Sequence, residues 1–293
     1  MSFYEIEFPL APFGAEAVEA ALLELAPSSI TFLDRGDEPV LEPGVGEILL
    51  WNDTLVRVLF DESSDPVGNI GHLASRLGPE ITASAQLRRV ENRVWEREWL
   101  TDWKSMRFGT RLWVCPWSSA APADPMAVIV RLDPGLAFGT GTHPTTALCL
   151  EALDSLPLSG RSVIDYGCGS GILAMAALKL GARHATAVDI DPQALLATRD
   201  NALRNGVSAS LDTQGIEAAL IAADCVLANI LAQPLIDLAP QLTAVCKPGG
   251  HFILSGILRN QCEAVTAAYR PGFSIVRCIE RDDWCCIHAR RVA

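Results

Sequence analysis

The stretch Val163–Ala174, VIDYGCGSGILA, constrains the fold more than any other part of the chain. It begins with apolar, β-prone residues, has glycines at every second position from Gly167 to Gly171, and ends in a run rich in Ala and Leu. Glycine tolerates positive φ and the close approach of a ligand, and the first N–H groups of a helix are free to bind ligand oxygens. The pattern predicts a strand, a glycine turn and a helix, the first half of a nucleotide-binding βαβ unit.

The glycine spacing separates two kinds of nucleotide cofactor. A dinucleotide fingerprint, G-x-G-x-x-G, would need its third glycine at position 172, which is Ile172. The observed pattern, D-x-G-x-G-x-G from Asp165 to Gly171, resembles the first motif of the class I S-adenosylmethionine (SAM) methyltransferases. One predicted strand later, Asp189 ends the segment ATAVDI, where an acid binds ribose hydroxyls. The alternatives are an NAD enzyme, which the spacing disfavours, and a Rossmann-type binding module without catalysis.

The net charge is concentrated at the N-terminal end. Residues 1–85 hold fifteen Asp and Glu but only three Arg, and so carry the whole formal charge of −12. Such a surface repels nucleic-acid phosphates and attracts basic partners, although acidic residues also serve solubility alone. We therefore expect no direct recognition of nucleic acid.

Composition and cysteine usage limit the remaining classes. With 293 residues, 49% of them hydrophobic, the chain can bury a core in one large or two ordinary domains. It has no apolar run near the roughly 18 residues of a membrane span, and its start, MSFYEIEFPL, lacks the basic region of a signal peptide. Cys285, Cys286 and His288 alternate in a predicted strand, so we expect buried thiols in a reducing cytosol and no metal site.

Residues 1–90 have the pattern of a small α+β domain. Helical composition is confined to two segments, Ala15–Leu25 and Val67–Leu77. The predicted strands are Phe3–Leu10, Ser29–Leu33, two runs within Glu47–Phe60, and Ile81–Val90. This order, roughly β-α-β-β-α-β, is the ferredoxin-like plan. It holds no obvious catalytic group, and we interpret it as a substrate-recognition domain.

Residues 91–106, ENRVWEREWLTDWKSM, predict a linker helix. Trp95, Trp99 and Trp103 recur every four residues, which places three indoles on one side of a helix. A connecting helix packed on both domains is the favoured interpretation, and a platform for ligand stacking is the alternative.

Two further features belong to residues 107–293. Asp133–Thr146, DPGLAFGTGTHPTT, has the composition of an ordered loop and leads into a helix at Pro144. It predicts a lid or wall over a bound cofactor, or the start of the helix alone. The later segments predict a seven-stranded sheet. After the strand of the glycine motif and the strand that ends in ATAVDI, its further strands are 208–213, 224–230, 251–258, 274–279 and 284–290, the last two an antiparallel pair. Helices are predicted at 192–205, 233–246 and 261–269, and two more strands, 108–115 and 127–132, precede the loop.

Several motifs together resemble the ribosomal protein L11 methyltransferase family, whose substrate is the eleventh protein of the large ribosomal subunit. They are LDPGLAFGTGTHPTT, VIDYGCGSGILA, VDIDPQAL and VLANILAQPL, with WEREW and MRFGTRLWVCP before them and Trp284–Cys285 after them. The resemblance implies an α/β fold: a Rossmann-like, seven-stranded class I methyltransferase domain (107–293) after a small recognition domain. It implies a cytoplasmic enzyme that uses SAM to methylate lysine side chains or the N-terminal α-amine of this basic ribosomal protein.

The resemblance also transfers binding residues. Thr146, Gly167, Asp189 and Asn229 match the SAM-binding positions of the family, and Asp165 and Gly169 are expected to support them.

Asn229 is the expected catalytic residue. Many amino-methyltransferases carry Asn-Pro-Pro-aromatic at this place, but here Asn229 is followed by Ile-Leu-Ala. The missing aromatic ring disfavours a stacked planar substrate and suits an aliphatic amine, which the Asn229 amide oxygen would orient. His143 is a weak candidate for a general base, and a structural role in the loop is favoured. Another protein, a small molecule or a nucleic acid as methyl acceptor is the alternative.

Overall fold

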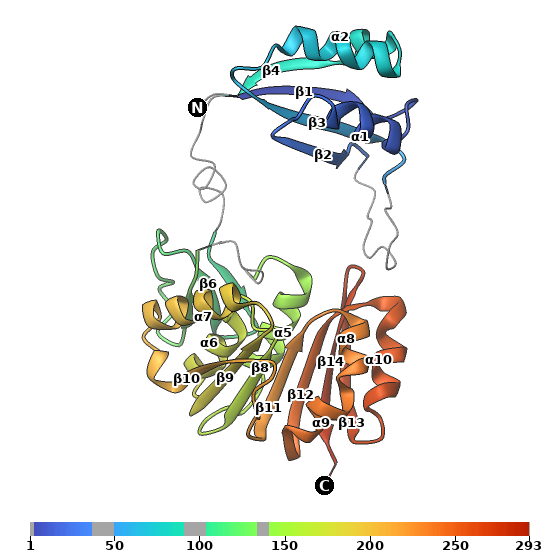
Figure 1. Ribbon diagram of the computed structural model, residues 1–293. Helices are drawn as coiled ribbons and strands as arrows, with labels where there is room; N and C mark the ends of the chain where they lie inside the picture. The colour runs from blue at the N-terminus through green and yellow to red at the C-terminus, as the bar shows by residue number, and fades with distance from the viewer. Residues whose placement is uncertain (1–2, 37–49, 91–103, 134–140, 293) are drawn as a thin grey trace. The chain divides into compact units, whose positions relative to one another are not determined.

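The computed structural model describes residues 3–36, 50–90, 104–133 and 141–292 (Figure 1). The chain divides into two compact units, Met1–Trp95 and Glu96–Ala293, each of which has its own core. This division falls inside the predicted linker, whose three tryptophans lie outside the described residues.

The N-terminal unit is one antiparallel sheet with helices packed on it. Its elements are β1 (Phe3–Pro9), α1 (Ala15–Leu23), β2 (Ser29–Asp34), β3 (Thr54–Asp61), α2 (Pro66–Leu77), α3 (Glu80–Ser84) and β4 (Gln86–Val90). The strand order is β2-β3-β1-β4, and every neighbouring pair is antiparallel. The core lies between this sheet and its helices, where Phe8 and Val58 meet Leu22 and Leu73. The predicted order β-α-β-β-α-β is present, with α3 added, and the ferredoxin-like assignment stays a prediction.

Alternating residues explain why one face of this sheet is buried and the other is charged. On β1, Ile6 and Phe8 point into the core, while Glu7 between them points away and pairs with Arg57 on β3 (Nη2–Oε1 2.6 Å). Glu7 is also 3.6 Å from Arg88 on β4. These pairs neutralise part of the acidic charge of the domain at the sheet.

Two of the predicted N-terminal strands are wrong in part. Residues 81–84 belong to helix α3, and β4 begins only at Gln86, because Pro79 suits the start of a helix rather than a strand. In the predicted run 47–51, Leu50 and Trp51 are not in a strand, and the other residues lie outside the described part.

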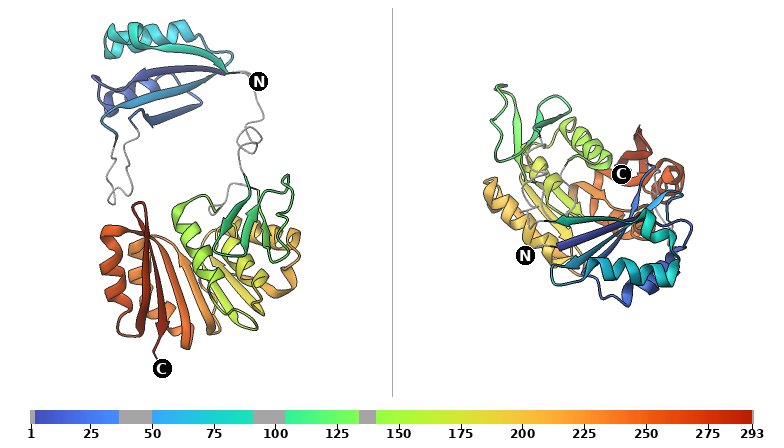
Figure 2. Two further views of the ribbon diagram at one scale, coloured as in Figure 1. Left: turned by 180° about the vertical axis from the view of Figure 1, so that it is seen from behind. Right: turned by 90° about the horizontal axis from the view of Figure 1, so that it is seen from above.

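The C-terminal unit is built around a seven-stranded sheet (Figure 2). Its strands are β8 (Ser162–Tyr166), β9 (His184–Asp189), β10 (Leu211–Gly215), β11 (Ala223–Asn229), β12 (Cys246–Leu258), β13 (Phe273–Arg281) and β14 (Trp284–Arg291). The order is β10-β9-β8-β11-β12-β14-β13. The first five strands are parallel, and β14 lies antiparallel between β12 and β13, which confirms the predicted final pair.

Helices cover both faces of this sheet. They are α5 (Pro144–Asp154), α6 (Ile172–Lys179), α7 (Pro192–Arg204), α8 (Ala232–Asp237), α9 (Ala239–Ala244) and α10 (Cys262–Tyr269), with short 3-10 turns at Ser208–Ser210 and Arg259–Gln261. Along β11, Cys225 and Leu227 enter the core under α5 and α6, while Val226 and Ala228 enter the core under α8 to α10. A strand buried on both faces reads as a continuous apolar run, as VLA does here. None of the helices in the described residues is long and apolar enough to cross a membrane.

A small three-stranded sheet precedes α5. It consists of β5 (Met106–Phe108), β6 (Leu112–Cys115) and β7 (Val128–Arg131). The predicted single strand 108–115 is therefore wrong, because Gly109 takes φ +70° and turns the chain between β5 and β6. The predicted linker helix is wrong at its last three residues, because Lys104 and Ser105 lie in no helix and Met106 begins β5.

Two C-terminal predictions also change in their bounds. The helix predicted over 233–246 is two helices, which meet at Leu238 just before Pro240. The strand predicted over 208–213 starts only at Leu211, after a 3-10 turn.

Candidate cofactor site

The candidate site lies at the carboxyl ends of the parallel strands, where the strand order reverses. Chain order runs outward from β8 to β9 and β10 on one side and to β11 and β12 on the other. Open α/β sheets bind ligands at such a switch point. A cavity of about 480 Å³ lies there. Five of the six predicted ligand residues line this cavity, and they are Thr146, Gly167, Gly169, Asp189 and Asn229.

The glycine turn after β8 is held closely against its neighbours. Gly167 and Cys168 donate their N–H groups to the carbonyl of Val188 on β9 (2.8 and 3.0 Å). From α7, Thr198 Oγ1 donates to the Gly169 carbonyl (3.0 Å), and the side-chain amide of Asn201 donates to the Ser170 carbonyl (3.0 Å). The turn is therefore fixed from both sides before any ligand binds.

Glycine is required at the head of this turn. Gly167 takes φ +76°, and a Cβ there would collide with the side chain of Ile230 after β11. Gly167 follows β8 and Ile230 follows β11, so a side chain at position 167 would fill the space between these two strand ends, where the cavity lies. The first glycine of the motif thus has a packing reason beyond backbone freedom.

Asp189 joins the turn to the end of β9. Its Oδ2 accepts the N–H of Gly169 (2.9 Å), and its Oδ1 accepts the N–H of Asp191 (3.0 Å). Each carboxylate oxygen can accept a second hydrogen bond. The side chain lines the cavity with this capacity remaining, so it can accept hydrogen bonds from a vicinal diol such as that of a ribose.

Asn229 and Thr146 meet on the other side of the cavity. Asn229 ends β11, and its amide nitrogen donates to Thr146 Oγ1 of α5 over 3.2 Å. Its Oδ1 atom is buried and has no hydrogen-bond partner among the described residues. A buried acceptor without a donor costs free energy. The Asn229 oxygen is thus suited to accept a hydrogen bond from a bound molecule.

Asp165, the sixth predicted residue, is buried beneath the cavity and does not line it. Its Oδ2 accepts the N–H of Ala174 in α6 (2.9 Å), and its Oδ1 has no partner. Burial raises the pKa of this carboxyl to about 7, and the nearby negative charge of Asp189 adds to the rise. A positive charge on a bound ligand would favour the ionised form of this carboxyl.

The sequence analysis missed the apolar part of the cavity. Tyr166, Ile190, Ile216, Leu231 and Pro234 also line it. Ile190 and Leu231 are exposed large hydrophobic side chains (76% and 55%), which suits them to contact a flat apolar ring. Three of these residues lie just after a parallel strand: Ile190 follows β9, Ile216 follows β10, and Leu231 is two residues past β11. Their position after a strand is the sequence signal that could have identified them as cavity residues.

His143, the weak candidate for a general base, takes a structural role. His143 caps α5, where its ring accepts the N–H of Thr145 (3.4 Å) and packs edge-on against Trp284 (centroids 4.9 Å apart). Burial lowers the pKa of His143, and its side chain does not line the cavity. The rest of the predicted lid, residues 134–140, lies outside the described residues.

The three neighbours on β14 that were considered for metal binding point to separate places. Cys285 enters the core under α8 to α10, whereas Cys286 enters the opposite core. His288 pairs with His251 on β12 (3.1 Å). These three side chains do not form one ligand set.

The sheet order, the glycine turn with its acid, and the cavity at the switch point define a Rossmann-like domain of the class I methyltransferase type. Comparison with known proteins gives the family. A model of the family "Ribosomal protein L11 methyltransferase (PrmA)" matches residues 2–292. The chain belongs to this ribosomal protein L11 methyltransferase family.

Individual relatives agree with the family over the whole chain. The chain is 49% identical to the ribosomal protein L11 methyltransferase of Azotobacter vinelandii over 286 residues, which covers 97% of each chain. It is 50% identical to the protein of the same name from Hahella chejuensis, over 100% of this chain and 99% of that protein. A crystal structure described as ribosomal protein L11 methylase from Lactobacillus delbrueckii subsp. bulgaricus is 33% identical. It covers 65% of this chain and 100% of its own, with a TM-score of 0.59.

Proposed function

We propose that the chain uses SAM to methylate amino groups of ribosomal protein L11. Family membership supports the reaction class and the substrate. The observation that carries the proposal is the cavity that joins Asp189, Asn229 and Thr146 above a buried carboxyl. These residues fit SAM, because Asp189 suits ribose hydroxyls and the cavity lining suits an adenine ring. When bound, SAM supplies a methyl group on a positively charged sulfur.

The acceptor amine must be neutral when it attacks. At pH 7 this costs roughly 4–5 kcal/mol for a lysine and about 1 kcal/mol for an α-amine, given ordinary pKa values near 10.4 and 7.8. The ionisable side chains among the described cavity residues are Tyr166, Cys168 and Asp189. Burial raises the pKa of Tyr166, and it raises that of Cys168 to about 12, so both stay protonated. We propose that the amine loses its proton to solvent, and that positioning supplies most of the rate.

Asn229 is the proposed positioning group for the amine. Its unpartnered Oδ1 can accept an N–H of the attacking nitrogen, while its amide nitrogen stays fixed on Thr146. A hydrogen bond from the amine to this oxygen would hold the nitrogen lone pair in a fixed direction. An aliphatic amine needs no stacking ring, which agrees with Ile230 and Leu231 following the Asn.

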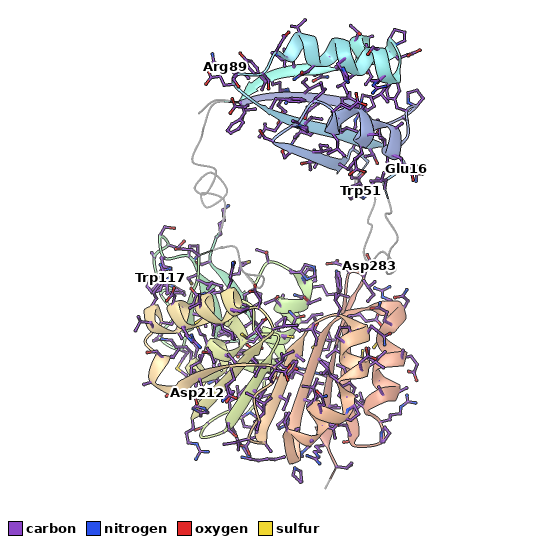
Figure 3. All side chains as sticks on the ribbon, in the orientation of Figure 1. Glu16, Trp51, Arg89, Trp117, Asp212 and Asp283 are labelled. Carbon is purple, nitrogen blue, oxygen red and sulfur yellow. The ribbon has the colours of Figure 1, made fainter. Side chains whose placement is uncertain are left out.

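The N-terminal unit is the proposed recognition domain for a basic protein. Glu16 and Glu19 are exposed on α1, and Asp65 and Glu80 are exposed around α2. Figure 3 shows Glu16 on the surface of this unit. Acidic side chains on one domain steer a basic substrate and repel nucleic acid. A ribosomal protein substrate supports a cytoplasmic location, which we propose for this enzyme.

Mass spectrometry tests the proposal. Ribosomal proteins from cells that lack the enzyme are incubated with the purified chain and SAM carrying a heavy methyl group. We expect heavy methyl groups on L11, at lysine or α-amino nitrogens, and much less label with the Asp189→Ala variant at a limiting SAM concentration. Label on another protein alone would show that the family substrate does not apply to this chain.

A further inference from the structure

Three cysteine side chains meet at the edge of the C-terminal unit, away from the cofactor cavity. Cys262 is the first residue of α10, Cys278 lies on β13, and Cys285 lies on β14. Their three sulfur atoms lie within 4.8 Å of one another. Cys262 and Cys278 are 3.1 Å apart, and Cys278 and Cys285 are 3.6 Å apart. Cys278 and Cys285 thus belong to the β13–β14 hairpin, whose turn residue Asp283 is labelled in Figure 3.

The environment of these thiols differs from that of the other cysteines. The remaining six cysteine side chains are all buried. Here Cys285 is buried, Cys262 is half-buried and Cys278 is exposed, so one side of the group opens to solvent. An ion can enter from that side without unfolding the core. Within the described residues this is the group whose ligand atoms are close enough to share a metal ion.

We propose that Cys262, Cys278 and Cys285 bind one thiophilic metal ion of the Zn²⁺ class through three sulfur atoms. A zinc–sulfur bond is about 2.3 Å long, so three sulfurs around one ion would lie about 3.8–4.0 Å from one another. The observed separations, from 3.1 Å to at most 4.8 Å, bracket this range. Small side-chain movements would suffice. The exposed side at Cys278 leaves a fourth position for water.

The reaction balances as a proton exchange. Each thiol releases its proton to solvent as its sulfur bonds to the ion, with no change of oxidation state. Burial raises the pKa of the Cys278 thiol to about 12 and that of Cys285 still further, so these two thiols are protonated when no ion is bound. A bound cation reverses this preference, because a coordinated thiol is deprotonated outright.

A disulfide between Cys262 and Cys278 is the competing use of these sulfurs. It would need an oxidant and a shortening of their separation from 3.1 Å to about 2.05 Å. The thiolate is the form that reacts in such an exchange. A disulfide would join only two of the three sulfurs, whereas one metal ion would use all three, so the three-sulfur arrangement favours metal binding.

Cadmium is the probe for this site, because its sulfur bonds absorb in the ultraviolet. The full chain, reduced with a phosphine and kept without oxygen, is titrated with Cd²⁺. We expect one ion per chain, a sulfur-to-cadmium band, and displacement of the ion by Zn²⁺. Cys278→Ser should weaken binding by at least about tenfold, since even outer-shell partners of metal sites contribute 10–100-fold.

The matched control removes a cysteine outside the group. Cys115→Ala, on β6, should bind Cd²⁺ as tightly as the parent chain. SAM binding and melting temperature show that both variants are folded. Equal Cd²⁺ affinity in the parent and in Cys278→Ser would overturn the proposal, as would the absence of the band in the parent. A Cys262–Cys278 disulfide that survives treatment with the phosphine and blocks the binding of Cd²⁺ would also overturn the proposal.

Discussion

Replacing Asp189 with alanine tests the cofactor site most directly. Both carboxylate oxygens already accept one backbone N–H group, from Gly169 and from Asp191. Their remaining acceptor capacity faces the cavity. Asp189→Ala would therefore remove the proposed ribose contacts and leave two loop N–H groups without their partner.

The magnitude follows from the kind of hydrogen bond lost. A hydrogen bond to a charged group contributes roughly 1.5–3 kcal/mol. Water replaces part of the lost hydrogen bonding, so we expect the total loss of SAM-binding free energy to be close to the contribution of one such bond. This corresponds to a SAM affinity about 10- to 150-fold weaker. Asp189→Asn keeps one oxygen as acceptor and loses the charge, so it should fall between the parent and Asp189→Ala.

Asp191 offers a matched control two residues away. It has the same charge and caps α7 through the N–H of Gln193 (2.8 Å), but it does not line the cavity. Asp191→Ala should lower stability by about 1 kcal/mol, the usual value of such a cap, and leave SAM affinity unchanged. Calorimetry with SAM, together with urea unfolding of each variant, separates the two effects. If Asp189→Ala bound SAM as tightly as the parent, or if Asp191→Ala lost affinity equally, the assignment would be refuted.

Three further predictions concern chemistry, electrostatics and recognition. Asn229→Ala should lower the single-turnover methylation rate by roughly tenfold, the value of one hydrogen bond, with a smaller loss of SAM affinity; a full rate would exclude Asn229 from the mechanism. Asp165 has a folded pKa near 7, above its unfolded value of 3.8, so the native state binds the extra proton between these values. The free energy of unfolding should therefore fall as pH rises from about 4 to 7, and Asp165→Asn should flatten this fall in urea titrations; an unchanged slope would contradict it. A chain beginning at Ser105 should still bind SAM but methylate L11 much more slowly, and association by the intact chain should slow with salt as the Debye length shrinks from about 10 Å to about 3 Å. Equal rates from both chains would show that residues 1–85 do not recognise the substrate.

The sheet was predictable because its signals are local. The glycine turn between β8 and α6 needs three residues at fixed spacing, and Asp189 marks the end of the next strand. Buried parallel strands appear in the sequence as short apolar runs, so β11 was predicted to within one residue at each end. The end of β12 was predicted as well, but the strand begins at Cys246, before the predicted start at residue 251. The fixed right-handed crossover of parallel units then limits the strand order.

Other features depend on contacts that distant segments make. The break between β5 and β6 occurs at Gly109, where a Cβ would contact the Asp154 side chain from α5. Asp165 belongs to the glycine motif by its position, but its carboxyl is buried and does not line the cavity. The spacing of the motif cannot show whether such a residue binds the ligand directly or supports the site from below. The meeting of Cys262 with Cys278 and Cys285 depends on how α10 packs beside the hairpin, which no local pattern encodes.

The cofactor site combines several features that are unfavourable without a ligand. Asp165 is a buried carboxyl with an unpaired oxygen, the nearby negative charge of Asp189 adds to the rise in its pKa, and the Asn229 oxygen has no donor among the described residues. Each of these costs free energy in the empty protein. SAM has a positive sulfur and an ammonium group, and it can offset the negative charge while its polar atoms supply the missing donors. The product keeps the ammonium group but loses the positive charge on sulfur, so part of the electrostatic gain disappears after transfer. A negatively charged, preformed site of this kind favours the charged donor over its product.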